Sequence, residues 1–175
     1  MADLEYLIRR VALKDREAFS LLYKEINKRV YFYILGLVKD ETAAQDILAD
    51  TFIEIWKSAA KFQGRSKAIT WILGIARNLS FKFLKKNRTF DDIDDHYELK
   101  SNEAESFVDK FANIELVKKG LERLSPKHRE VLHLVFFEEL PYEEISNLLK
   151  IPLNTVKTRV YHAKKALKQE LSRED

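Results

Sequence analysis

The sequence contains no cysteine, and it has only 4 glycines and 3 prolines in 175 residues. Without cysteine, disulfides, thiol catalysis and cysteine-ligated zinc sites are all excluded. This composition fits a reducing cytoplasm. Because glycine and proline are the residues that most often interrupt helices, their scarcity beside abundant Leu, Ile, Ala, Lys and Glu favours an all-helical protein.

Other functional classes lack their usual signals. The four histidines are scattered, without an HExxH pattern or a carboxylate cluster beside them, so we expect no metal site and no cofactor. The longest apolar runs, 30–38 and 69–76, are much shorter than the ~20 residues of a membrane span, and the charged N-terminus does not resemble a signal peptide. We recognise no nucleophile, acid–base pair or phosphate loop. We therefore expect a cytoplasmic protein that is not an enzyme and does not insert into membranes.

The net charge of +3 conceals a strong asymmetry along the chain. Residues 1–88 carry 17 Lys and Arg against 10 Asp and Glu, whereas residues 89–112 carry 2 against 8. Residues 113–175 carry 12 against 10, with the positive charge concentrated late in the sequence. This pattern indicates a basic lobe, an acidic strip and a second lobe.

Helical periodicity agrees with this division. Apolar residues recur at helical spacing over residues 4–12, 16–38, 42–62 and 67–86, and short connections between such helices favour a compact antiparallel bundle. The acidic stretch is weakly periodic, as is typical of a flexible segment. Periodicity returns at residue 113 for about four more helices. We predict two small helical domains, 1–88 and 113–175, joined by an acidic flexible linker at 89–112.

The segment 61–87 combines aromatic and basic residues. On a helical wheel the expected core positions are Ile69, Ile72, Ala76, Leu79 and Phe83. Trp71, Asn78, Lys82 and Lys85 fall on the opposite side. Such a face suits single-stranded or melting DNA, because aromatics stack on exposed bases while lysines neutralise phosphates. The preceding loop, 62–66, could line a pocket for an extruded base. Alternatively, Trp71 packs on a neighbouring helix and the lysines are a solvated face.

The segment 140–167 has the form of a helix-turn-helix. A short helix at 142–149 and a turn at 150–153 precede a longer basic helix at 154–171, whose N-terminal residues are placed to enter the major groove. The candidates for that entry are Asn154, Thr155, Lys157, Thr158, Arg159, Tyr161 and His162. We expect Lys164, Lys165 and Lys168 to meet phosphates or solvent. Lys150 occupies the turn, where Gly would more easily take positive φ. The alternative is a plain helical hairpin with a basic face.

At these two segments the chain resembles bacterial sigma factors of the extracytoplasmic-function group. The first motif stands here as Phe62, Gly64, Ser66, Thr70, Trp71 and the run Ile75-Ala76-Arg77-Asn78. The second stands as Leu124, Pro126, Arg129 to Leu132, Tyr142 to Ile145, Thr155 to Arg159 and Ala163 to Leu167. The resemblance covers nearly the whole chain.

This resemblance implies an alternative sigma factor, a promoter-specificity subunit that works with core RNA polymerase and is commonly held inactive by an anti-sigma factor. It implies docking on the β′ clamp helices, with the β subunit as a further partner, through Asp46, Leu48, Asp50, Phe52 and Trp56. It implies minus-ten recognition and melting by Phe62, Arg65, Ser66, Thr70, Trp71, Arg77, Asn78 and Lys82. It also implies minus-thirty-five recognition by Asn154, Thr155, Lys157, Thr158, Arg159, Tyr161, His162 and Lys165. The acidic linker would thread the basic channels of the polymerase.

The chain departs from the family pattern at several positions. The family's Gln-Glu pair in the clamp-docking helix is Ala49-Asp50 here, and the glycine of the helix-turn-helix turn is Lys150. Pro152 replaces the usual Ser that opens the recognition helix, and Asn154 replaces the Gly before Thr155. Two other interpretations stay open: a stand-alone helix-turn-helix regulator, and a helical adaptor with no nucleic-acid role.

Overall fold

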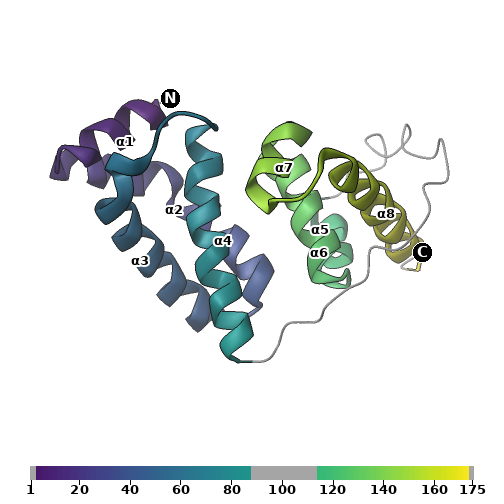
Figure 1. Cartoon of the computed structure of the whole chain (residues 1–175). Coiled ribbons are helices and arrows are strands. Elements are labelled where there is room, and N and C mark those ends of the chain that lie inside the picture. Colours follow the sequence, from purple (N-terminus) through teal and green to yellow (C-terminus); the bar gives the residue numbers. More distant parts are fainter. Residues whose placement is uncertain (1–2, 88–113, 174–175) are drawn as a thin grey trace. The chain divides into compact units, whose positions relative to one another are not determined.

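A computed structural model describes residues 3–87 and 114–173. Within these two ranges the regular elements are all helices, which confirms the all-helical prediction. The chain divides into two compact units, one built mainly from residues 3–87 and the other mainly from residues 114–173 (Figure 1). The predicted linker at 89–112 lies outside the described residues.

The first unit contains four α-helices. They are α1 (Leu4–Ala12), α2 (Arg16–Val38), α3 (Glu41–Ser58) and α4 (Ala68–Lys86), with a 3-10 turn η1 (Ala59–Lys61) after α3. The carboxylates of Asp3, Asp15 and Asp40 cap the first three helices by accepting backbone N–H groups of the first turn. The predicted helices at 4–12 and 16–38 are confirmed, whereas the third ends earlier than the expected residue 62.

Helix α2 contacts α1, α3 and α4 and carries much of the first unit's core. Its Ile26, Val30 and Ile34 are fully buried, as is Ile55 of α3. Burial of each such side chain contributes roughly 1.5–3 kcal/mol. Figure 1 shows α3 and α4 side by side in this unit.

The buried face of α4 differs from the expected one. Ile69, Ile72 and Ala76 are buried as predicted, but Leu79 and Phe83 are only half-buried. Ser80 and Leu84 are buried instead. The Ser80 hydroxyl donates to the carbonyl of Ala76 at 2.8 Å, so burial leaves no orphaned polar group and a serine can occupy the core.

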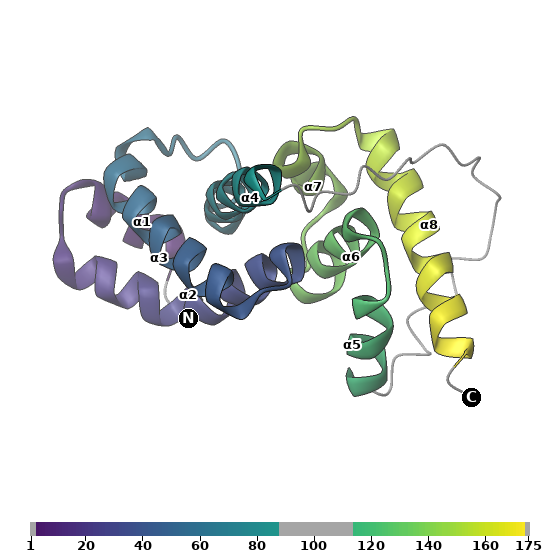
Figure 2. The same cartoon turned by 90° about the horizontal axis from the view of Figure 1, so that it is seen from below.

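The second unit contains α5 (Ile114–Glu122), α6 (Pro126–Leu132), α7 (Tyr142–Leu149) and α8 (Leu153–Ser172), with a π-helical turn η3 (His133–Phe137) between α6 and α7. Ser125 caps α6 and Pro126 occupies its first position, where its fixed φ suits a helix start. Helix α8, which is yellow in Figure 2, packs against α5 and α6. In the described ranges no helix is both long and apolar enough to cross a bilayer.

Candidate nucleic-acid and polymerase interfaces

The loop that leads into α4 is fixed by an aromatic contact. Phe62 at its start and Trp71 in the first turn of α4 have ring centroids 5.4 Å apart, with the planes inclined by 49°. Gly64 takes a left-handed φ of 72°, which lets the loop turn between them. Both rings are half-buried, so each keeps an open part. The structure therefore brings together two predicted minus-ten residues that are nine positions apart.

The remaining predicted minus-ten residues differ in exposure. Arg65, Asn78 and Lys82 are exposed, and Ser66 is half-buried. Arg77 lies with its guanidinium carbon 4.2 Å from the centroid of the Phe81 ring, and it is half-buried. Thr70 is 4 % exposed, and its buried hydroxyl oxygen has no hydrogen-bond partner. Its side chain is therefore not presented at the surface.

A tight turn separates α7 from α8. Lys150 ends α7 in the left-handed conformation with φ 56° and ψ 46°, and its N–H donates to the carbonyl of Ser146. The Ser146 hydroxyl in turn donates to the carbonyl of Ile151 at 2.6 Å. The turn thus has the positive φ that glycine usually supplies, with lysine in its place.

Most of the predicted groove-entry residues line the start of α8. Asn154, Lys157 and the later Lys165 are exposed. The half-buried members are Thr155, Thr158, Tyr161 and His162. The Thr158 hydroxyl donates to the carbonyl of Asn154 at 3.0 Å, and the rings of Tyr161 and His162 meet edge-on at 5.2 Å.

Two cations of α8 turn inward. Arg159 is only 7 % exposed. The ammonium of Lys164 lies 5.8 Å from the centroid of the Phe136 ring, and partial burial lowers its pKa. Because both charges are drawn toward the protein interior, they differ from the exposed Lys157 and Lys165.

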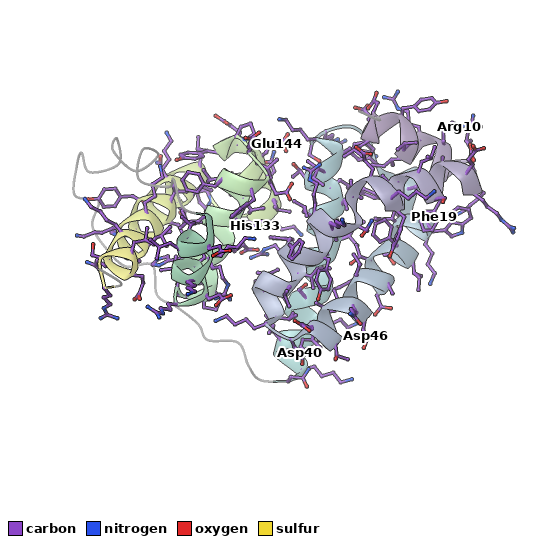
Figure 3. All side chains as sticks on the ribbon, turned by 180° about the vertical axis from the view of Figure 1, so that it is seen from behind. Arg10, Phe19, Asp40, Asp46, His133 and Glu144 are labelled. Carbon is purple, nitrogen blue, oxygen red and sulfur yellow. The ribbon has the colours of Figure 1, made fainter. Side chains whose placement is uncertain are left out.

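A third surface lies on α3. Asp46 (labelled in Figure 3) and Asp50 are exposed, and Leu48 is half-buried. Phe52 is 4 % exposed and meets the ring of Tyr23 edge-on at 4.8 Å.

Trp56 stabilises the helix that carries this surface. Its ring lies 5.2 Å from that of Phe19 and beneath the Lys14 ammonium, which is 4.7 Å from the Trp56 ring centroid. The Lys14 ammonium also donates to the Trp56 carbonyl at 2.6 Å. These contacts hold the far end of α3 against the start of α2.

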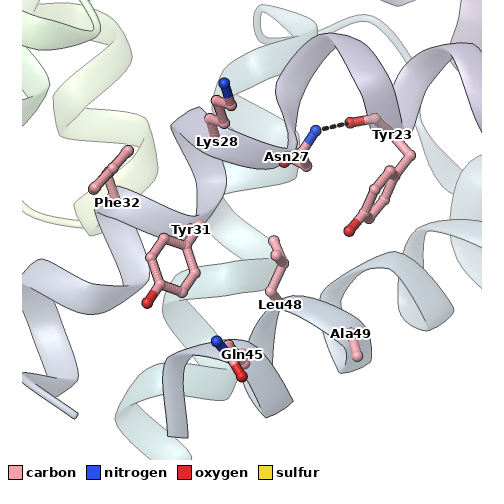
Figure 4. A pocket seen from close by; sticks show the side chains of 8 residues that line it. All are labelled: Tyr23, Asn27, Lys28, Tyr31, Phe32, Gln45, Leu48 and Ala49. Carbon is pink, nitrogen blue, oxygen red and sulfur yellow. Dashed lines mark hydrogen bonds between the residues drawn. The ribbon is translucent and has the colours of Figure 1, made fainter. Parts of the chain in front are cut away.

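A hollow of about 620 Å³ lies between α2 and α3 (Figure 4). Its lining residues are Tyr23, Asn27, Lys28, Tyr31, Phe32, Gln45, Leu48 and Ala49. Of these residues, the sequence pointed to Leu48 but not to those of α2. Their signal was aromatic side chains left on the surface: Phe32 is 57 % exposed and Tyr23 is 43 % exposed.

Family models match both units. Residues 22–90 match sigma-70 region 2, and residues 114–167 match sigma-70 region 4. The RNA polymerase sigma factor YlaC of Bacillus subtilis is 26 % identical over 170 residues, which cover 92 % of this chain and 96 % of that protein. The RNA polymerase sigma-H factor of Pseudomonas aeruginosa is 28 % identical, covering 95 % and 93 %. The extracytoplasmic-function (ECF) sigma factor SigK of Mycobacterium tuberculosis is 25 % identical, covering 95 % and 92 %. The chain belongs to the ECF sigma factors.

Solved structures share the fold of this ECF sigma factor. The sigma factor RpoE of Bartonella quintana, in complex with the anti-sigma factor NepR, is 20 % identical with a TM-score of 0.67, covering 90 % of this chain and 98 % of that one. CnrH in complex with the cytosolic domain of CnrY is 18 % identical with a TM-score of 0.71, covering 99 % and 100 %. Sigma factors are transcription initiation factors rather than enzymes.

Proposed function

We propose that this sigma factor binds core RNA polymerase in the bacterial cytoplasm and directs it to promoters by their minus-ten and minus-thirty-five elements, without a catalytic step of its own. One observation carries the proposal: each of the two matched regions presents its own surface suited to DNA. Region 2 offers the Phe62–Trp71 pair beside exposed cations, and region 4 offers a helix-turn-helix with a basic recognition helix.

We assign minus-ten recognition and melting to residues 1–88. The open faces of Phe62 and Trp71 are suited to stacking on bases that leave the duplex. Arg65, Asn78 and Lys82 are exposed and can bind phosphates or base edges, with Ser66 and Arg77 beside them. Thr70 contributes by packing, because its side chain is buried.

We assign minus-thirty-five recognition to residues 113–175. In a helix-turn-helix the first residues of the second helix reach base edges, and here Asn154 and Lys157 are the exposed side chains at that end. Each good bidentate contact contributes roughly 1–3 kcal/mol of discrimination. The half-buried Thr155, Thr158, Tyr161 and His162 complete this face, and Lys165 is placed to meet phosphate.

We assign polymerase docking to the outer surface of α2 and α3. Exposed Asp46 and Asp50 flank the half-buried Leu48, which also lines the apolar hollow of Figure 4. A helix with one apolar anchor and basic neighbours fits such a surface. Phe52 and Trp56 stabilise the α3 helix from behind through their contacts with Tyr23 and Phe19. An anti-sigma factor, as in the RpoE complex, would regulate the protein by competing for these surfaces.

Run-off transcription on a library of randomised promoters tests the function. The chain with core polymerase should select two conserved elements, whereas the chain alone should bind the same DNA weakly. Tight sequence-specific binding without polymerase, combined with no initiation in its presence, would instead identify a stand-alone helix-turn-helix regulator.

Docking has its own test with a matched control. Leu48→Arg should lower the affinity for core polymerase, because a charge then enters the apolar hollow. Leu13 is 70 % exposed in the turn after α1 and is not one of the residues that line the hollow. Leu13→Arg makes the same chemical change outside the hollow and should leave the affinity unchanged. Equal losses for the two variants, or none for Leu48→Arg, would contradict the assignment.

A further inference from the structure

A charged residue is buried in the recognition helix. Arg159 is 7 % exposed and shares a face of α8 with Val156 and Val160, which are 0 % and 2 % exposed. This is the face that packs against the rest of the second unit, whereas Lys157 on the other side is exposed. A buried guanidinium is stable only when acceptors inside the protein replace its hydration. Arg159 therefore requires an internal carboxylate or carbonyl partner.

Helix α6 buries a charge of the opposite sign. Glu130 is 3 % exposed, and α6 packs directly against α8. Its neighbour Arg129 is also buried, at 7 % exposed, but interacts electrostatically with Glu122 as well as with Glu130. Several buried polar atoms lack a hydrogen-bond partner in the described ranges, but none of them belongs to Glu130 or Arg159. A buried charge of either sign needs a partner inside the fold, because leaving it unpaired incurs the full desolvation penalty.

The other carboxylates of the second unit fit less well. Glu138 lies 3.8 Å from His133, and Glu170 lies near Arg123 and Arg173.

Among the remaining carboxylates, Glu115, Glu122, Glu139 and Glu143 are exposed. Glu144 of α7 is only half-buried. Glu130 is therefore the best candidate for the partner of Arg159, because it is a buried carboxylate on the helix that packs against the inner side of α8. Glu144 is its nearest rival as the partner of Arg159.

We infer that Glu130 and Arg159 form a buried ion pair between α6 and α8, and that Arg159 positions the recognition helix instead of reading DNA. In this arrangement the pair fixes the rotation of α8 about its axis. Because successive residues of a helix are turned by about 100°, a small rotation would change which side chains meet the groove. Promoter discrimination then depends on Lys157 and its exposed neighbours, while Arg159 holds them in register.

A double-mutant cycle in the full-length chain tests the pair. Hydrogen–deuterium exchange of α8 amides measures the equilibrium constant for local opening. Arg159→Met and Glu130→Met should each raise that constant on the order of a hundredfold, because each leaves one buried charge without its partner. The double variant should rise by far less than the product, because an apolar pair of similar volume replaces the ions. Independent, multiplying effects would overturn the pairing. So would coupling of Arg159→Met to Glu144→Met in place of Glu130→Met.

A second readout separates positioning from DNA contact, and this one rests on the proposed function. On promoters varied at each upstream base pair, the Arg159→Met/Glu130→Met variant should rank the bases as the unsubstituted chain does. Lys157→Ala should flatten the preference at one or two positions by about fivefold to a hundredfold. If the double variant flattens a preference to the same extent, Arg159 reads DNA and the inference is wrong. If the unsubstituted chain shows no initiation, the proposed function fails, and the exchange cycle still decides whether the pair exists.

Discussion

The ring of Trp71 contacts the ring of Phe62, with centroids 5.4 Å apart and planes inclined by 49°. This pair joins the loop 62–67 to the first turn of α4, a helix whose N-cap residue, Lys67, makes no side-chain capping bond. The indole therefore has two roles in our proposal. It holds the loop in place, and its open part is available to an unstacked base.

Trp71→Ala should reduce initiation on duplex promoters by about fivefold to a hundredfold, the range that corresponds to about 1–3 kcal/mol of base stacking. On templates already melted at the minus-ten element, activity should recover, because the variant no longer has to capture a base from the duplex. Run-off assays on paired and heteroduplex templates measure both values. Trp71→Phe, which keeps a ring against Phe62, is the control and should lose less. If melted templates fail to rescue Trp71→Ala, Trp71 acts only by packing.

Asp15 makes the stability of the first unit depend on pH. Its carboxylate accepts the N–H groups of Glu17 and Ala18 and pairs with Arg10 at 3.1 Å. The Ala18 N–H first, and Arg10 next, hold the pKa of Asp15 below its usual 3.8. A lowered folded pKa means that the ionised form stabilises the fold. This contribution is complete above the unfolded pKa and is lost as pH falls through the folded value.

Asp15→Asn keeps the helix cap but removes the charge. The variant should be less stable than the unsubstituted chain at about pH 5, and the difference should shrink as pH falls toward about 2.5. Urea unfolding followed by tryptophan fluorescence measures this directly, since the chain's two tryptophans, Trp56 and Trp71, both lie in the first unit. A difference that stays constant over this range would show that the charge contributes nothing.

Two helical glycines should respond oppositely to alanine. A Cβ added to Gly36 of α2 would meet no atom within 4 Å, so Gly36→Ala should stabilise the first unit by about 0.5–1 kcal/mol through helix propensity. At Gly120 of α5 the added Cβ would lie 2.7 Å from Leu167 Cδ1 and 3.3 Å from Leu171 Cδ2. Overpacking costs about 1–3 kcal/mol, which exceeds the propensity gain, so Gly120→Ala should destabilise the second unit.

Fluorescence unfolding measures the Gly36 variant, and hydrogen exchange of α5 and α8 measures the Gly120 variant. Gly120→Ala combined with Leu167→Ala removes the obstructing methyl groups, so the two changes should couple favourably. Additive effects would mean that α5 and α8 accommodate the methyl group by moving.

The sequence was sufficient for the helices and the family. Clean apolar spacing placed α1 and α2 at the predicted residues. Helix α4 was harder because it packs against both α2 and α3. Two adjacent faces of α4 are therefore partly buried. A helical wheel that ranks residues by hydrophobicity places Phe83 in the core, whereas the structure buries Ser80.

The interfaces could be predicted only by residue type. An arginine early in a recognition helix is typical of base contact, and nothing in local spacing shows that Arg159 and Glu130 are both buried. Likewise the hollow beside Leu48 depends on how α2 aromatics meet α3, which is a tertiary relationship. Motifs identify the surface, and packing decides which of its side chains are available.

Three of the four non-glycine residues with left-handed φ in the described ranges are lysines that follow helix ends: Lys14, Lys39 and Lys150. Each places a cation near the negative end of a helix dipole, in a backbone geometry that lysine adopts with strain. Replacing one of these lysines by glycine would relieve the backbone strain but remove the favourable interaction of its charge with the helix dipole. The two effects on stability therefore oppose each other. Glycine substitutions at these three lysines should therefore raise the thermal stability of the protein little, whereas Gly36→Ala inside α2 should raise it more.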